Sequence, residues 1–522
     1  MIFGDLGCLG DLITRNARVF PNREGWVFEG KRFSWKEANQ RVNRLANAIL
    51  RLGLRPGDRL AILGKNSHRF LESFFAAAKT GIIAVKPNYR YRDRELGFIL
   101  QDSEARGIIF DGEFSGMVRT LSGVLSHLTR FICTDQKVEG AIEYESLLEG
   151  SEPTEPPRDI QAQDLVMIQY TSGTTSSARG AMMTHGGQIA LANNGAINLG
   201  RHRMLIPLPL FSAAATGRVL SHIYLGNTIV ILKEFAPRLF LDMLQKERIT
   251  YTGLIPSMFY LLMEGVPNLK DYDTRSLQHI LYGGGPMTAG LLKVAMQIFE
   301  NCGFEGGYGL TETGPYGSRL LPEEHKVEGS EKELSRLGSV GRMAINGLLK
   351  IVGGKGEDLP PGEIGEIAIS CDSNMVGYWN RPEETAETLK GGWVFTGDLG
   401  VMDEEGYVFI KDRKKDLIIS GGFNIFPREV EEVLMAHPGV LEAAVIGIPD
   451  DKWGESILAV VKMKEGHSVT QQDLIEHCRQ NLASFKKPQR IEFVKEFPRT
   501  PTHKIQKFIL REKYLAGGRR IN

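Results

Sequence analysis

The sequence predicts an α/β protein with a large N-terminal region of stacked αβ sheets, a small β-barrel or sandwich, and a small mobile α+β C-terminal domain. Over the first third, apolar runs typical of buried strands alternate with helical patterns, which indicates repeated βαβ units. From Gly338 onward, short β segments are separated by glycine. A chain of 522 residues exceeds what one hydrophobic core usually serves, so at least two domains are expected.

Composition narrows the class of protein. Lys+Arg and Asp+Glu both total 63, so no overall charge favours nucleic acid or an anionic membrane. The cysteines lack C-x-x-C spacing, which argues against zinc, disulfides or a redox pair and fits a reducing cytoplasm. No signal-peptide pattern opens the chain, and the most apolar stretch, 204–232, contains prolines and an arginine. A cytoplasmic protein without a transmembrane segment is therefore expected.

The N-terminal elements follow from local patterns. Trp26–Phe28 and Arg32–Phe33 predict a hairpin, and Ser34 with Glu37 forms an S-x-x-E capping box that opens a helix. Strands and helices are then expected to alternate at 59–63, 72–79, 82–85, 92–101 and 107–110. The acidic, proline-rich stretch 149–157 is expected to be a surface connection between two lobes.

A polar loop follows the apolar run 165–168, which is expected to be a buried strand. Residues 170–180 read YTSGTTSSARG. Hydroxyls and closely spaced backbone N–H groups are suited to wrapping phosphate oxygens, and Arg179 adds a permanent positive charge. The segment is not a Walker A loop. On this pattern alone, a polyphosphate site and a solvated loop both stay open.

Two more strand ends carry unusual loops. Strands at 228–232 and 280–282 and a helix at 240–247 continue the α/β pattern. Three glycines, 283–285, follow the strand at 280–282, which indicates either close approach of a ligand to the backbone or a tight turn. Another strand-to-loop edge is expected at 308–313. Because ligands lie outside the carboxyl ends of strands in open α/β sheets, the three loops are expected to share one crevice.

The last third predicts two further parts. Short strands are expected at 348–352, 365–370, 393–396 and 407–411, and helices near 428–436 and 471–481. The charged run 412–416 is a candidate junction. We therefore expect an N-terminal domain over 1–412 and a C-terminal domain over 413–522.

Six motifs occur in one order along the chain: YTSGTTSSARG, YGLTET, GYWNRPEETAE, FTGD, DRKKDLIISGGFN and PRTPTHKIQK. In this order and spacing they resemble the AMP-forming adenylating superfamily, and the chain most resembles its acyl-CoA synthetase branch. The resemblance covers nearly the whole chain. It implies that a carboxylate attacks the α-phosphate of ATP, that pyrophosphate leaves, and that the thiol of coenzyme A captures the acyl-adenylate. ATP, Mg²⁺ and coenzyme A are thus implied.

The resemblance also assigns residues to nucleotide binding. Thr311 would bond the α-phosphate, and Glu312 would help to place Mg²⁺, a cation that prefers oxygen ligands. Asp398 would accept hydrogen bonds from the ribose, with Arg413 helping. Lys504 resembles the family's lysine that reaches the carboxylate and the α-phosphate. The remaining implied ATP-binding residues are Thr171, Ser172, Gly173, Thr174, Thr175 and Arg179 around the phosphates, and Tyr308, Gly309, Gly283, Gly284 and Gly285 around the adenine.

Further implied residues concern the second half-reaction and the acid. Lys415 matches the hinge about which the C-terminal domain rotates in this family, and Gly421 and Gly422 would line the pantetheine passage. Phe211, Ser212 and Gly284 are expected at the acyl pocket. Small residues at 213–215 indicate an open acyl entrance or, equally, core packing.

Three positions depart from the family pattern: Ser176, Arg179 and His503 stand where typical members carry glycine, lysine and glycine. Arg179 keeps the positive charge, so nucleotide binding is expected to survive. The expected partners are a small carboxylic acid, fatty or cyclic, with ATP and CoA, and the expected state is a monomer or homo-oligomer that binds no nucleic acid.

Two other functional classes stay open. One is adenylation followed by loading of a carrier protein or by oxidation of the adenylate, as in luciferases. The other is a nucleotide-binding module without catalysis, which has no need of Lys504 and Glu312.

Overall fold

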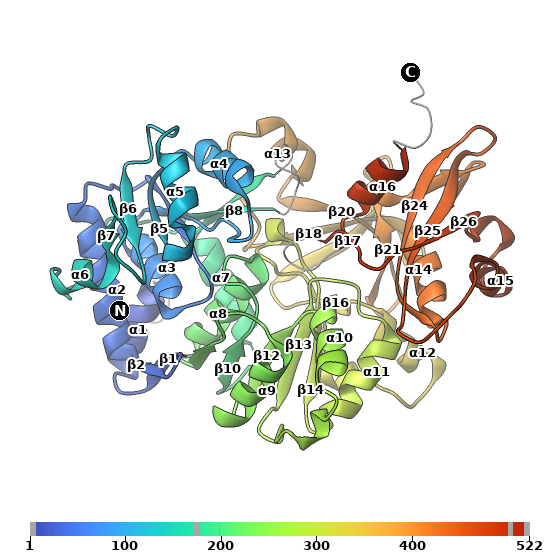
Figure 1. The fold of residues 1–522 in the computed structure, drawn as a ribbon, viewed down its shortest axis with the longest axis horizontal. Coiled ribbons are helices and arrows are strands. Elements are labelled where there is room, and N and C mark those ends of the chain that lie inside the picture. The colour runs from blue at the N-terminus through green and yellow to red at the C-terminus, as the bar shows by residue number, and fades with distance from the viewer. Residues whose placement is uncertain (1–6, 172–177, 198, 500–504, 516–522) are drawn as a thin grey trace. The chain divides into compact units, whose positions relative to one another are not determined.

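The structure, a computed structural model, describes residues 7–171, 178–197, 199–499 and 505–515 (Figure 1). It divides into two compact units, one of Met1–Leu349 and Ile369–Phe395, the other of Lys350–Ala368 and Thr396–Asn522. The two units are compact groups of residues. The boundary expected after residue 412 is that of a C-terminal domain that rotates as a body, and it stays a prediction.

Two sheets form the first unit, as the repeated βαβ pattern predicts. The larger has the order β16 (Arg342–Met343), β15 (Ser318–Leu320), β14 (Gly303–Gly307), β13 (His279–Gly283), β12 (Tyr251–Leu254), β10 (Arg203–Ile206), β11 (Thr228–Ile231), β1 (Glu24–Phe28) and β2 (Lys31–Ser34). The smaller has the order β7 (Ile142–Glu143), β6 (Arg130–Cys133), β5 (Ala105–Phe110), β3 (Arg59–Leu63), β4 (Ile83–Val85), β8 (Leu165–Tyr170) and β9 (Gly180–Thr184). Neighbouring strands from β1 through β11, β10, β12 and β13 to β14 run parallel.

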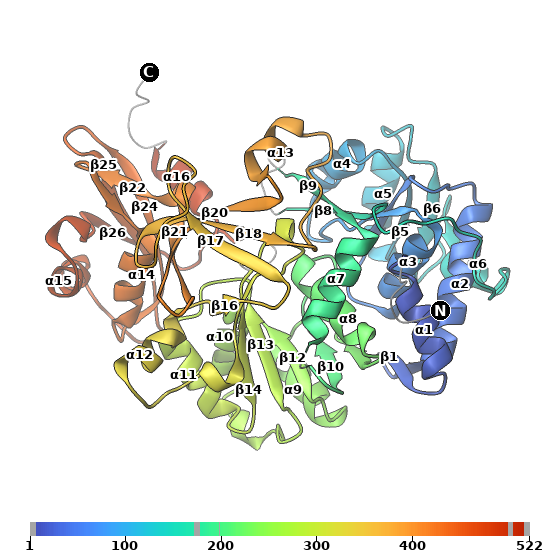
Figure 2. The same ribbon diagram turned by 180° about the vertical axis from the view of Figure 1, so that it is seen from behind.

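The first unit also contains helices, several of which pack on its sheets. They are α1 (Asp11–Val19), α2 (Trp35–Arg51), α3 (His68–Thr80), α4 (Asp93–Asp102), α5 (Ser115–Ser122), α6 (Tyr144–Glu149), α7 (His185–Ala196), α8 (Ala213–Tyr224), α9 (Pro237–Lys246), α10 (Pro256–Gly265), α11 (Ala289–Ile298), α12 (Glu331–Ser335) and α13 (Pro382–Thr388). The two opposed views show α9, α10 and α11 on one face of the larger sheet and α7 and α8 on the other (Figures 1 and 2).

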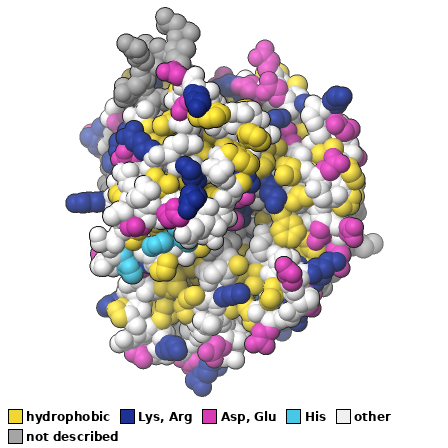
Figure 3. Space-filling view, turned by 90° about the vertical axis from the view of Figure 1, so that its right-hand side faces the viewer, with side chains coloured by type: hydrophobic (Ala, Val, Ile, Leu, Met, Phe, Trp, Pro, Cys, Tyr) yellow, Lys and Arg dark blue, Asp and Glu magenta, His cyan; other side chains and the backbone are white. Residues whose placement is uncertain are grey.

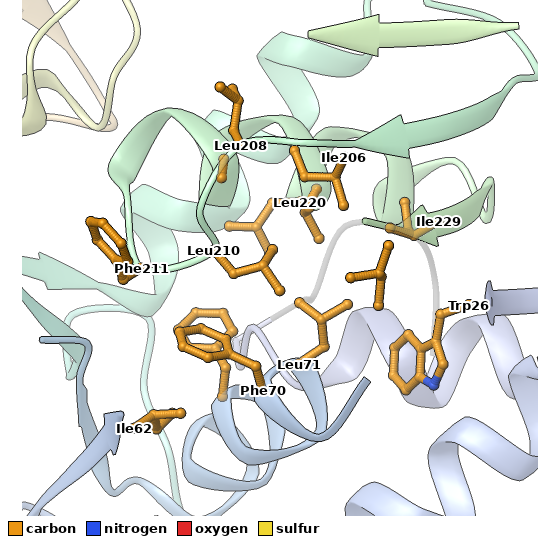
Figure 4. Close-up of a cluster of buried hydrophobic side chains, with 14 of the residues drawn as sticks. Trp26, Ile62, Phe70, Leu71, Ile206, Leu208, Leu210, Phe211, Leu220 and Ile229 are labelled. Atoms are coloured by element: carbon orange, nitrogen blue, oxygen red, sulfur yellow. The ribbon is translucent and has the colours of Figure 1, made fainter. Parts of the chain in front are cut away.

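The hydrophobic core of this unit joins the two sheets through helices. Its buried side chains come from β1, β10 and β11 of the larger sheet, from β3 of the smaller sheet, and from α3 and α8 (Figure 4). Trp26, Phe70 and Leu220 represent these layers. Burial of such side chains stabilises the fold by about 1.5–3 kcal/mol each. The core therefore holds α8 against the sheet that carries the glycine-rich loops.

Local signals set several helix ends. The capping box at the start of α2 is confirmed, because Ser34 Oγ accepts from Glu37 N and the Glu37 carboxylate accepts from Ser34 N. The helix expected at 72–79 begins earlier, at His68, because Ser67 Oγ accepts from Phe70 N at 3.1 Å and caps it.

The stretch 149–157 was expected to connect two lobes, and this prediction is wrong. It leads from α6 to β8, and β8 belongs to the same sheet as the strands that precede α6. Glu155 lies 2.8 Å from the buried Nζ of Lys79 and accepts from Asn39 at 2.9 Å. The composition of the stretch 149–157 resembles that of a linker. The carboxylate of Glu155 nevertheless supplies the counter-charge for the buried Lys79.

The second unit contains the α+β domain expected at the C-terminal end. Its sheet is formed by β22 (Ile418–Ser420), β23 (Phe423–Ile425), β24 (Val440–Asp450), β25 (Gly454–Met463) and β26 (Arg490–Phe493). Alternate side chains of β24 and β25 form two cores. One includes residues of α14 (Pro427–Ala436) and α15 (Gln471–Asn481), and the other includes Leu510 of α16 (Lys507–Leu515).

A third group of strands matches the small barrel or sandwich expected after residue 338. β17 (Gly347–Val352), β18 (Ile364–Cys371), β20 (Trp393–Met402) and β19 (Leu389–Lys390) lie in this order, and β21 (Val408–Arg413) pairs with β20. Together these strands form one five-stranded sheet.

Surface properties agree with the balanced charge. On the face in Figure 3, basic and acidic side chains are interspersed. Among the described residues, no helix has the length and apolarity needed to cross a bilayer.

One buried charge in the first unit predicts a pH-dependent stability. Lys86 Nζ donates to Thr216 Oγ1 and lies 5.0 Å from the Phe74 ring centroid, and burial lowers its pKa to about 7. Since this pKa is below the unfolded value of about 10.4, the folded state binds fewer protons between pH 7 and 10.4, and stability rises with pH by up to about 1.4 kcal/mol per unit. Lys86→Met should therefore raise the urea midpoint most near pH 7 and progressively less towards pH 10.

The exposed Lys246→Met on α9 is the matched control and should leave the midpoint unchanged. Equal effects of Lys86→Met at pH 7 and pH 10 would contradict a buried, titrating amine.

Candidate active site

The ends of the polar loop are tied together. Thr171 N donates to Arg179 O at 3.0 Å, and Arg179 N donates to Thr171 Oγ1 at 3.4 Å. Thr171 follows the last residue of β8, so the predicted strand before the loop is confirmed; Arg179 precedes β9, a strand that the sequence analysis did not predict. The expected phosphate residues Ser172, Gly173, Thr174 and Thr175 lie outside the described residues.

A distant segment, 376–379, pairs with the strand that leaves this loop. Met182 N donates to Gly377 O at 2.9 Å, Val376 N to Met182 O at 3.0 Å, and Trp379 N to Gly180 O at 2.7 Å. Backbone hydrogen bonds of this kind set register, because each fixes which residues lie side by side. The pairing therefore places Tyr378 beside the loop.

Tyr378 joins two of the predicted site residues. Its hydroxyl donates to Glu312 Oε1 at 2.7 Å, and the Arg179 guanidinium lies 4.5 Å from its ring centroid. Cation–π contacts at this distance are attractive, and a charge-assisted hydrogen bond is stronger than a neutral one. Burial, with the Glu312 carboxylate, raises the pKa of Tyr378, so the hydroxyl keeps its proton. Arg179 thus contacts the ring of Tyr378, and Glu312 contacts the hydroxyl of the same side chain.

Glu312 sits in a short 3₁₀ turn, Thr311–Thr313, and is buried. Its backbone oxygen accepts from Met375 N at 2.8 Å, which holds the turn. In the part of the chain that the structure describes, no three His, Cys, Asp or Glu side chains form a metal-ligating group. A single carboxylate suits Mg²⁺ when phosphate oxygens and water complete its shell, so the residues fit an ATP-bound magnesium ion.

The glycine-rich loops border one cavity of about 90 Å³. Gly284, Tyr308 and Gly309 are among the residues that line it. Gly283 has a separate structural reason, since an added Cβ would lie 2.2 Å from Gly307 O on the neighbouring strand. Gly284 has φ +77°, a left-handed conformation that favours glycine. Close strand approach and loop geometry therefore account for two glycines that the sequence left open.

Asp398 and Arg413 come together in the second unit. They are directly opposite on β20 and β21, and Arg413 Nε lies 2.9 Å from Asp398 Oδ1. Asp398 is buried, and the Arg413 side chain is about half-exposed. The two residues expected at the ribose thus form one ion pair.

Gly421 and Gly422 are the two turn residues between β22 and β23, with φ of +57° and +82°. Positive φ at both central residues is what a tight type I′ hairpin requires. Lys415 is exposed in the 3₁₀ turn Lys414–Asp416. Their expected roles in the CoA passage and the hinge stay predictions, as does that of Lys504, which lies outside the described residues.

Phe211 and Ser212 lie at the start of α8. Phe211 is buried with its ring centroid 5.6 Å from that of Tyr89. Ser212 Oγ accepts from Ala215 N at 3.2 Å and caps the helix. Neither borders the cavity described above, whereas Ala214 does. Their expected place in the acyl pocket stays a prediction.

Two functional candidates were missed by sequence reasoning. Tyr378 stands inside the motif GYWNRPEETAE, but its partner Glu312 is distant in sequence and only the fold brings them together. Arg218 lines the cavity from α8. The available signal for it was an arginine in a helix that contains no other Lys, Arg, Asp or Glu.

Comparisons with known proteins decide the family. A model of the AMP-binding enzyme matches residues 13–379, and one of its C-terminal domain matches 429–504. The chain belongs to the AMP-binding enzyme family. Within that family, it lies in the acyl-CoA synthetase branch of AMP-forming acid–thiol ligases, as the motifs predicted.

Individual relatives span the whole chain. It is 34% identical over 516 residues to the long-chain-fatty-acid–CoA ligase FadD13 of Mycobacterium tuberculosis, covering 97% of this chain and 99% of that protein. It is 34% identical over 518 residues to the fatty acid–[acyl-carrier-protein] ligase ScoC of Streptomyces coeruleorubidus, covering 97% and 96%. The solved structure of a Mycobacterium tuberculosis fatty acyl CoA synthetase matches with TM-score 0.77 and 33% identity, covering 98% of this chain and 99% of the other.

Tyr378→Phe tests the link between the loop and the turn. The substitution leaves the buried Glu312 carboxylate without one hydrogen-bond donor, at an expected cost of about 1–3 kcal/mol. The carboxylate is then held less firmly, so its expected binding of Mg²⁺ should weaken. We expect acid-dependent ATP–pyrophosphate exchange to fall about ten-fold or more and to need more Mg²⁺ for half-maximal rate. Tyr224→Phe, at the end of α8, is the control, and an unchanged Mg²⁺ requirement in Tyr378→Phe would contradict the role.

Proposed function

We propose that the chain converts a carboxylic acid into its CoA thioester through an acyl-adenylate, with release of AMP and pyrophosphate. The contact of Tyr378 with both Arg179 and Glu312 supports this most directly. It joins the polar loop to the Thr311–Thr313 turn within one unit. A polyphosphate near both segments would have a cation on one side and a carboxylate suited to its metal on the other.

Charge is the main problem of the first half-reaction. A carboxylate anion must approach a polyanion, so fixed positive charge and oriented donors must offset repulsion and the charge on the leaving group. Arg179 supplies the charge at the end of the loop, and the Thr171 hydroxyl is oriented by Arg179 N. Lys504 is proposed to supply a second charge at the α-phosphate.

Magnesium is proposed to bind the phosphates with Glu312 as its protein ligand. When bound, it neutralises part of the phosphate charge and so assists departure of pyrophosphate. Tyr378 orients the Glu312 carboxylate by its hydrogen bond, and burial limits other conformations of that side chain.

A carrier protein is the second candidate acceptor of the acyl group, because ScoC is named as an acyl-carrier-protein ligase. Both acceptors end in a thiol, so the adenylation residues are the same in either case. The deciding experiment is AMP release from ATP and an acid panel, measured with CoA, with a holo-carrier protein, and with neither. ADP as the nucleotide product would overturn the proposal.

The Asp398–Arg413 pair predicts a nucleotide-binding defect. Asp398→Ala removes an acceptor proposed for the ribose hydroxyls, and a charge-assisted hydrogen bond is worth about 1.5–3 kcal/mol. The Kd of ATP, measured by calorimetry on the folded variant, should therefore rise about ten- to hundred-fold. Asp398→Asn keeps an acceptor, so its Kd for ATP should lie between that of the unsubstituted protein and that of Asp398→Ala. An unchanged Kd in Asp398→Ala would show that this residue serves only the β20–β21 pairing.

The two half-reactions predict separable defects. Lys504→Ala should lower pyrophosphate exchange about hundred- to thousand-fold yet spare CoA transfer from synthetic acyl-adenylate. Gly422→Leu should lower CoA transfer from synthetic acyl-adenylate and spare pyrophosphate exchange, because a side chain would enter the proposed pantetheine passage. Gly466→Leu is its matched control, since Gly466 also has positive φ, +77° against +82°, with no heavy atom within 4 Å of an added Cβ. If folded Lys504 and Gly422 variants each lost both activities in parallel, the proposal that these two residues serve different half-reactions would be contradicted.

A further inference from the structure

The face of α8 that borders the cavity carries small and polar residues. Ala214, Gly217, Arg218, Ser221 and His222 line it at the three- to four-residue spacing that puts side chains on one helix face. The facing strands contribute Tyr251 of β12, Leu281 of β13, Gly307 of β14 and Arg319 of β15. A cavity between a helix and a sheet therefore contains two arginines.

Arg218 reaches the middle of the sheet because Gly253 has no side chain. A Cβ on Gly253 would lie 2.4 Å from Arg218 Nε, so any larger residue there would displace the guanidinium. The guanidinium donates through Nη1 to Ala214 O, one turn back on its own helix, at 3.1 Å. Its Nε is buried and, within the described ranges, has no hydrogen-bond acceptor. A buried donor of this kind is unfavourable unless a ligand completes it.

Glu305 is a buried carboxylate whose charge acts on Arg218, and it is already paired with other groups. Glu305 Oε1 lies 2.7 Å from Arg319 Nη1, and Glu305 Oε2 lies 2.8 Å from His279 Nε2. One carboxylate thus faces two arginines, and Arg319 is the one in contact with it. Burial lowers the pKa of Arg218, and the charge of Arg319 acts in the same direction, whereas Tyr251 and Glu305 act against both.

His222 adds a second donor one helical turn along. Its Nδ1 accepts from Asn227 Nδ2 at 3.2 Å, so the neutral ring carries its proton on Nε2. Burial lowers the pKa of His222 well below its usual value, which keeps the ring neutral. The Nε2 atom is buried, and it too has no acceptor in the described part of the chain. Arg218 and His222 therefore both line the cavity from α8, and each has a buried donor atom without an acceptor.

We propose that the acid used by this enzyme carries a second carboxylate, at the end opposite the activated carboxyl, and that Arg218 binds it with His222 as an additional donor. A carboxylate provides both the negative charge that the cluster lacks and the lone pairs that these donors need. The inference rests on the proposed function, because it concerns the acid of that same reaction.

The other residues that line the cavity indicate the chemistry of the acid between its two carboxylates. Leu191, Leu199, Leu281 and Pro315 add apolar side chains to the lining of the same cavity. An aliphatic or aromatic body therefore suits it, and the volume of about 90 Å³ favours a short acid. The substrate class is a short dicarboxylic acid with an apolar middle.

Matched acids test the inference with the full chain. Octanedioic acid is symmetric, so either carboxyl can be activated, and octanoic acid differs from it by one carboxylate. A second pair is 3-(4-carboxyphenyl)propanoic acid and 3-(4-isopropylphenyl)propanoic acid, which have similar shapes. The kcat/KM for AMP release with CoA is expected to favour each diacid by about ten-fold or more, as a charged hydrogen bond predicts.

Four variants separate charge, geometry and folding. Arg218→Met should lower the diacid-to-monoacid ratio about ten- to hundred-fold, and Arg218→Lys, which keeps the charge but not the fork, should have a smaller effect. Gly253→Ala should act like Arg218→Met by displacing the guanidinium without removing it. Arg238→Met, an exposed arginine on α9, should leave the ratio unchanged.

The two ways of failing are distinguishable. Calorimetric titration of octanedioic acid without ATP reports binding without turnover, and Arg218→Met should weaken it by a similar factor. Arg218-dependent binding without AMP release from any acid would overturn the proposed function and support the subsite. AMP release with equal or greater preference for the monoacids, or a ratio unaffected by both Arg218→Met and Gly253→Ala, would overturn the subsite alone.

Discussion

The arrangement around the nucleotide motifs depends on backbone pairing between β9 and residues 376–379. Three hydrogen bonds join segments that are almost two hundred residues apart in the chain. They fix the register at which Tyr378 meets Glu312, and through its ring they bring Arg179 to the same place. Side-chain contacts alone would allow these long groups several positions. Backbone register leaves one, which is the preorganisation that charge stabilisation during phosphoryl chemistry needs.

Sequence reasoning succeeded where a local pattern has one physical solution. Strand periodicity, the Ser34–Glu37 capping box and the ordered motifs all specify structure within a short window. It failed where a distant residue decides, as when Glu155 proved to be the partner of Lys79. Tyr378 was overlooked for the same reason. Gly283 shows a third case, since a neighbouring strand and a ligand would both require glycine and the sequence alone does not separate them.

Buried charges in the first unit fall into two groups. Arg41 with Glu72, Lys79 with Glu155 and Arg319 with Glu305 are paired, and each pair joins different elements. Such pairs offset the free energy of burial and specify which elements meet. Among the described residues, Lys86 and Arg218 form no ion pair with a carboxylate; Lys86 donates to Thr216 of α8, and Arg218 belongs to that helix. Pairing with a carboxylate thus distinguishes the buried charges that stabilise contacts between elements from Lys86 and Arg218, which do not serve in such a pair.

Helix α8 has an evolutionary consequence. Its cavity-lining residues are mostly small, whereas Arg179, Glu312 and Tyr378 lie on other elements. Single substitutions on this helix, or at Gly253 beneath it, therefore reshape the cavity without touching those three residues. After gene duplication, copies of such a chain can diverge in the acids they accept while their ATP chemistry stays under unchanged selection. A large family of related ligases with different acids is the outcome that this separation favours.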